Sequence, residues 1–130
     1  MALQTPYPKV QGSRFLLGPD LQGETILIIP GTSDYTTNGY VITAVEAGLK
    51  MIQQAIVTGG NATAYAAAAA TWAIPVFPET QLNSAATLPG SGFTGYSQFL
   101  LKVIISSTGA EVGNGGNLTG YVWQVMILGY

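Results

Sequence analysis

Neither cysteine nor histidine occurs anywhere in the 130-residue sequence. The absence of cysteine excludes a disulfide framework, a thiol nucleophile and a cysteine metal site. The absence of histidine removes the commonest general base and the commonest ligand of transition metals. The six carboxylates are scattered singly along the chain, and no spacing among them marks the acid pair of a glycosidase. We therefore predict that the protein is not an enzyme and holds no cofactor and no metal ion.

Charge is also scarce, because Asp, Glu, Lys and Arg together make up only 8% of the residues. Typical soluble domains contain roughly 25%. The few basic residues form no run, so we predict no nucleic-acid partner. No apolar run approaches the roughly 20 residues of a membrane span, and the first residues lack a secretory signal pattern, so we predict no membrane partner. The polar residues are mainly Thr, Gln, Ser, Asn and Gly, which suit packed or assembled surfaces.

The length fits one domain of about 100–200 residues, and two regions differ in composition. Residues 1–23 are punctuated by proline and glycine, which predicts an extended N-terminal arm. The apolar tripeptide Phe15-Leu16-Leu17 is a candidate short strand or anchor within this arm. Residues 24–130 contain short β-branched and aromatic runs separated by turn formers, which predicts a β-sandwich domain.

Strand-like runs that recur every 10–20 residues with little helix predict an all-β fold. We expect a compact β-sandwich or barrel, jelly-roll-like, with one short helical turn. That turn is expected where Thr43 and Glu46 fit a capping box shortly before Gly48. The expected strands are residues 25–29, 40–42, 51–57, 99–105 and 121–128.

Three segments are less regular. In residues 62–73, five consecutive alanines favour a helix by propensity, but flanking glycines and prolines favour a strand, which we prefer. Residues 80–97 lack any periodicity and predict the longest loop. The glycine-rich residues 113–117 predict a tight hairpin turn before the last strand, because Asn-Gly tolerates positive φ.

Three segments together resemble a family of small tailed-bacteriophage capsid cement or decoration proteins, which are head-associated structural proteins. Residues 38–49 read NGYVITAVEAGL and are similar to the family's "GGxPLTAADLGL" segment. Residues 112–119 read VGNGGNLT and are similar to its "VANGTDLS" turn. Residues 128–130 read LGY, the ending of the family's last strand. The alanine-rich segment departs from the family's mixed polar and aromatic middle strand.

The resemblance implies a structural virion protein that binds the outside of a capsid, bridges neighbouring capsomers and stabilises the shell. It implies the major capsid protein as partner, a homotrimer, and a place on the virion after synthesis in the host cytoplasm. We expect arm residues to contact the capsid; the candidates are Tyr7, Lys9, Arg14 and Phe15. Aromatic residues are enriched at protein interfaces. The candidates for contacts between copies are Trp72, Tyr121, Trp123 and Tyr130.

Two other functions fit the sequence. A carbohydrate-binding or fibre-tip receptor-binding β-sandwich would present exposed aromatic rings beside a groove, around Trp72 or Tyr96. A tail or neck component would also be a small, weakly charged chain that assembles with other proteins. The sequence does not separate the neck or tail role from the capsid role.

Overall fold

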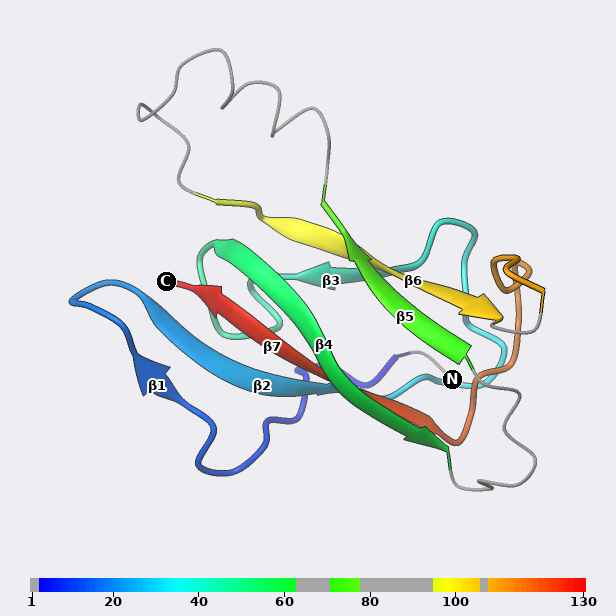
Figure 1. Cartoon of the computed structure of the whole chain (residues 1–130), viewed down its shortest axis with the longest axis horizontal. Helices are drawn as coiled ribbons and strands as arrows, with labels where there is room; N and C mark the ends of the chain where they lie inside the picture. Colours follow the sequence, from blue (N-terminus) through cyan, green and yellow to red (C-terminus); the bar gives the residue numbers. More distant parts are fainter. Residues whose placement is uncertain (1–2, 63–70, 78–94, 106–107) are drawn as a thin grey trace, which may run out of the picture.

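The computed structural model describes residues 3–62, 71–77, 95–105 and 108–130. Its strands form two antiparallel sheets packed together, as Figure 1 shows. The four-stranded sheet has the order β1 (Phe15–Leu16), β2 (Gln22–Ile28), β7 (Tyr121–Gly129), β4 (Ile52–Ala62). The three-stranded sheet has the order β3 (Tyr40–Thr43), β6 (Gln98–Ile105), β5 (Thr71–Val76). The predicted all-β sandwich is confirmed, and the described residues contain no helix.

The core lies between the two sheets and consists of alternate residues along the strands. β-Branched and aromatic side chains suit a pleated surface with one buried face, which is why these runs form strands. Burial of each large apolar side chain contributes roughly 1.5–3 kcal/mol to folding. The large core side chains with no exposed surface are Ile26, Ile28, Ile42, Ile52, Phe99, Leu101, Val103, Val125 and Ile127.

Strand β4 continues past the end that the sequence predicted. We expected residues 51–57 to form this strand, with Gly59-Gly60 ending it, but it pairs with β7 as far as Ala62. The pairing continues past Gly60 because glycine has no side chain; a side chain at this position would collide with the ring of Trp123. Of the alanine-rich segment 62–73, the structure places Ala62 in β4 and residues 71–73 in β5, and residues 63–70 lie outside the described residues. Most of the predicted loop 80–97 also lies outside them.

The glycine-rich turn at residues 113–117 does not form the predicted hairpin. β6 and β7 belong to different sheets, so the chain between them crosses from one sheet to the other. A local turn does form, in which the Gly116 N–H donates to the Gly113 carbonyl at 2.9 Å. Before this turn the chain runs beside β6, where the Val112 N–H donates to the Val103 carbonyl at 3.0 Å.

The predicted short turn after β3 is present, but only half of its capping box forms. The Glu46 N–H donates to Thr43 Oγ1 at 3.3 Å, as the motif predicts. The Thr43 N–H, which Glu46 was expected to accept, donates instead to the Tyr7 hydroxyl at 3.1 Å. Gly48 then ends the turn with a φ of +81°, which favours glycine.

The N-terminal arm is extended, as predicted, but it is part of the sandwich. The Val10 N–H donates to the Thr25 carbonyl at 2.9 Å, and the Leu27 N–H donates to the Pro8 carbonyl at 2.7 Å. The arm therefore satisfies the backbone groups along the edge of β2. The boundary that we predicted between residues 23 and 24 is wrong as a structural division, because it falls inside β2.

Candidate functional site

Tyr7, the first arm residue expected to touch a capsid, lies in the core. Its side chain is 3% exposed, and its hydroxyl lies between the Thr43 N–H at 3.1 Å and the Val41 carbonyl at 3.4 Å. Burial raises the pKa of Tyr7. The prediction of Tyr7 as a surface contact is wrong, because its ring fills the space between the arm and β3.

The other three arm candidates lie nearer the surface. Lys9 Nζ lies 3.1 Å from Glu24 Oε1, so its charge is used within the chain to pair a buried carboxylate. Arg14 is exposed and makes no ion pair with any described residue. The ring of Phe15 lies over Gly23, where it leaves no space for a side chain, and is 36% exposed.

The four aromatic residues expected between copies separate into different environments. Trp123 is 3% exposed in the core, so its prediction as a subunit contact is wrong. Tyr121 stacks on Trp123 with ring centroids 5.6 Å apart, and Tyr130 is half-buried at the end of β7. Trp72 is the exception, since 63% of it is exposed on β5. Tyr96, the other residue suggested for a sugar groove, is buried at 6% exposure.

Trp72 belongs to a mainly apolar surface on the outer side of the three-stranded sheet. The register places Trp72 beside Ile104, and Val76 beside Leu100, which in turn lies beside Val41. Lys102 lies in the middle of this surface, next to Ile74. We call this surface the apolar face; its apolar residues are Val41, Trp72, Ile74, Val76, Leu100 and Ile104.

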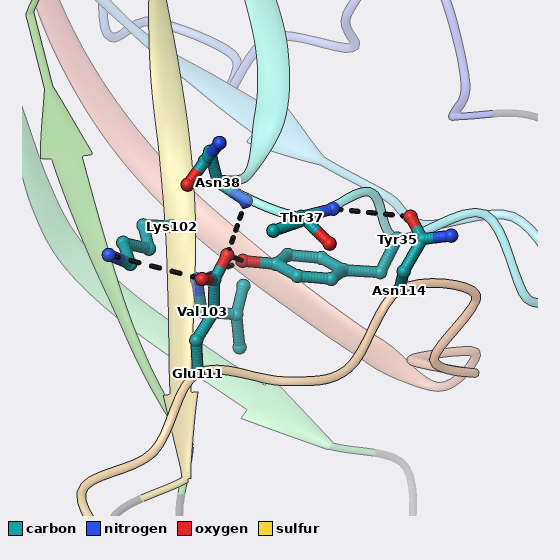
Figure 2. Close-up of polar contacts among 7 residues, drawn as sticks. All are labelled: Tyr35, Thr37, Asn38, Lys102, Val103, Glu111 and Asn114. Carbon is teal, nitrogen blue, oxygen red and sulfur yellow. Dashed lines mark hydrogen bonds and ion pairs between the residues drawn. The ribbon is translucent and has the colours of Figure 1, made fainter.

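A polar cluster borders the apolar face at its β3 side (Figure 2). The buried Tyr35 hydroxyl accepts the Val103 N–H at 3.0 Å and donates to Glu111 Oε1 at 2.8 Å. The same Oε1 accepts the Asn38 N–H at 2.6 Å, and Oε2 lies 3.9 Å from Lys102 Nζ. Both oxygens of Glu111 therefore have partners, and they connect the loop that contains Glu111 with the loop before β3 and with β6.

Neighbouring contacts extend this cluster along the loop before β3. The Thr37 N–H donates to Asn114 Oδ1 at 3.3 Å, which Figure 2 also shows. The Tyr40 hydroxyl donates to Asp34 Oδ1 at 3.0 Å. Burial raises the pKa of Tyr35 to about 12, with the Glu111 carboxylate adding to the rise. Burial, together with Asp34, raises the pKa of Tyr40.

These arrangements are suited to holding loops and surfaces in place. No three carboxylates gather closely enough to hold a metal ion in the part of the chain that the structure describes. Within the same residues, no helix has the length and hydropathy to cross a membrane. Comparisons with protein-family models, with curated proteins and with solved structures found no match.

Sequence reasoning identified Trp72 but missed the rest of the apolar face and all of the polar cluster. The alternation of Trp72, Ile74 and Val76 is a signal that could have found the face, since these positions share one side of a strand. Tyr35 and Glu111 are 76 positions apart and carry no local pattern that would join them.

Proposed function

We propose that the protein is a structural virion protein that binds the outside of a phage capsid as a cement or decoration protein. It bridges neighbouring capsomers as a homo-oligomer, a trimer by the resemblance, and requires no catalytic group. Many weak contacts repeated over the shell give durable attachment through multivalency. Binding to the assembled shell alone stabilises that state by mass action.

The apolar face is the observation that carries this proposal. A contiguous exposed apolar surface is typical of proteins that function in contact with other proteins. The three segments that resemble the phage family also lie near one another in the fold, through residues within or beside each segment. Asn38 in the first segment and Asn114 in the second both bind within the polar cluster, and the Lys50 N–H, one residue after the first segment, donates to the Tyr130 carbonyl at 2.6 Å.

The contact with the capsid is proposed at the tip formed by Arg14–Leu17. Leu16 is 69% exposed and Leu17 is 59% exposed, so this tip presents apolar side chains beside a cation. Arg14 and Lys50 line a groove of about 760 Å³ at the end of the molecule where β1 and the C-terminus lie (Figure 1). They are also the two cations that have no ion pair among the described residues.

The test is co-sedimentation of the purified chain with purified capsids and, separately, with isolated tails of the source phage. The wild-type chain is expected to sediment with capsids and to remain in solution with tails. Leu16→Asp is expected to weaken capsid binding at least tenfold, because a carboxylate replaces an apolar contact. Val45→Asp is the matched control, since Val45 is 80% exposed in the turn after β3.

A chain that does not sediment with capsids contradicts the proposed function. Equal binding by Leu16→Asp and the wild type contradicts the tip as the contact, even if the capsid role holds. Sedimentation with tails in place of capsids supports the tail or neck role.

A further inference from the structure

β5 is built with its large apolar side chains facing outward. Trp72, Ile74 and Val76 are 63%, 42% and 40% exposed, whereas the small Ala73 packs toward the core. A strand that covers a core normally turns its larger apolar residues inward, because burial of apolar area stabilises the fold. The reversed pattern indicates that the outer side of this strand is covered by something in the functional state.

The size of the apolar face matches one side of a stable protein–protein interface. Its four most exposed residues, Val41, Trp72, Ile74 and Val76, together expose roughly 400 Å². A standard interface buries about 800 Å² from each partner, of which a little over half is apolar. The apolar face therefore supplies a large share of the apolar area that contact with another protein requires.

Among the described edge strands, β3, β4 and β5 are poor surfaces for pairing with another copy, which favours association through a face. β4 has register shifts against β7 at Ile52/Gln54 and Val57/Gly59, and such bulges disfavour pairing with another chain. β5 contains Pro75, which has no N–H to donate. On β3, the Tyr7 hydroxyl already engages the Val41 carbonyl and the Thr43 N–H.

The charge of the apolar face is balanced within the chain. Among the described residues, Lys102 is the one charged residue on this face, and Glu111 lies 3.9 Å from its ammonium group. Tyr35 and Asn38 hold Glu111 in this position by hydrogen bonds of 2.8 Å and 2.6 Å. Identical faces can therefore approach one another without like-charge repulsion, and a partner needs no compensating charge.

We infer that the apolar face is where copies of this chain meet, with Trp72 as the anchor and with Glu111 neutralising Lys102 in each copy. This inference rests on the proposed self-association and identifies its surface. Contacts in a ring of three join two different parts of each copy, so in a trimer the apolar face lies at the threefold axis and is divided between its two neighbours. An exposed tryptophan is the type of residue that often dominates interface energy.

The experiment compares oligomeric mass by light scattering for Ile74→Thr and Ile56→Thr across a range of protein concentrations. Both residues are isoleucines on strands, 42% and 48% exposed, but Ile56 lies on β4 in the other sheet. The wild-type mass is expected near three times the 13.5 kDa of one chain. Ile74→Thr is expected to raise the concentration for half-dissociation at least tenfold, Trp72→Ser about a hundredfold, and Ile56→Thr less than twofold.

The role of Glu111 is tested by a charge rescue. Glu111→Gln leaves Lys102 unpaired and is expected to weaken association at least tenfold. The double variant Glu111→Gln with Lys102→Met removes both charges and is expected to restore association to within threefold of the wild type. Thermal unfolding followed by circular dichroism confirms that each variant is folded before its mass is measured.

A wild-type chain that stays monomeric at 100 µM, on the order of a weak complex, overturns the inference. Equal effects of Ile74→Thr and Ile56→Thr also overturn it, as does a double variant that remains dissociated. Sedimentation of the wild-type chain with capsids is a separate measurement. If the oligomeric-mass experiment contradicts the apolar face as the contact between copies, the proposed capsid role is still decided by the co-sedimentation result.

Discussion

Substitution of Tyr7 tests whether the N-terminal arm contributes to the stability of the sandwich. Its ring is 3% exposed, and its hydroxyl engages both the Thr43 N–H and the Val41 carbonyl. Tyr7→Phe keeps the ring and leaves the Thr43 N–H buried without its partner, which costs about 1–2 kcal/mol. Tyr7→Ala also removes the ring and leaves a cavity, which costs about 3–5 kcal/mol. Domains of this size have a total stability of about 5–15 kcal/mol, so the second loss is a large share of it.

The assay is urea unfolding followed by the fluorescence of Trp123, whose side chain is buried in the same core. Tyr130→Phe is the matched control, because the described residues give its half-buried hydroxyl no hydrogen bond. The control is expected to change the unfolding free energy by less than about 0.5 kcal/mol. A Tyr7→Phe variant as stable as the control would refute the argument that the Tyr7 hydroxyl is a stabilising hydrogen-bond partner of the Thr43 N–H in β3. Deletion of residues 1–10 without loss of stability would refute the inclusion of the arm in the sandwich.

Two further predictions concern Tyr35 and Gly39. The folded-state pKa of Tyr35, about 12, exceeds the usual value of 10.0, so its contribution to stability is complete below pH about 10 and is lost as the pH rises to about 12. Tyr35→Phe is expected to flatten the fall in unfolding free energy over this range, and an unchanged slope would contradict the assignment. Gly39→Ala is expected to cost at least about 2 kcal/mol, since φ is +119° and the new carbon would lie 2.6 Å from the Leu101 carbonyl oxygen. Gly18→Ala, in open space with ordinary φ, is expected to unfold in urea as the wild type does.

The class of fold was predictable because strand formation depends on local pattern. β-Branched runs such as residues 25–29 predicted β2, and the final aromatic and aliphatic run predicted β7. The assignment of strands to sheets was not predictable, since it depends on which partner offers the better buried surface. The prediction of a local turn at Gly113 was therefore correct, but the prediction that this turn joins two paired strands was wrong, because β6 and β7 lie in different sheets.

The candidate surfaces were less predictable than the fold, because burial is decided by contacts distant in the sequence. Tyr7 and Trp123 were expected to meet partners because aromatic residues are frequent at interfaces, yet both are buried in the core. Trp72 met the same criterion and is exposed. Aromatic character alone does not separate the three; their exposed fractions do, because burial depends on which strands pack around each ring.

The scarcity of charge explains why tyrosine performs two structural roles in this fold. Strand positions with no neighbouring strand on one side leave N–H groups without partners, and burial of such groups is costly unless an oxygen accepts their hydrogen bond. A chain with few carboxylates supplies that oxygen from the tyrosine hydroxyl, at Thr43 from Tyr7 and at Val103 from Tyr35. A tyrosine brings a large apolar ring to the core at the same time, which a carboxylate does not. Two of the few charged residues, Lys102 and Glu111, lie beside the apolar face and form an ion pair with no net charge. Because the pair has no net charge, the apolar face can contact another protein without an unpaired charge.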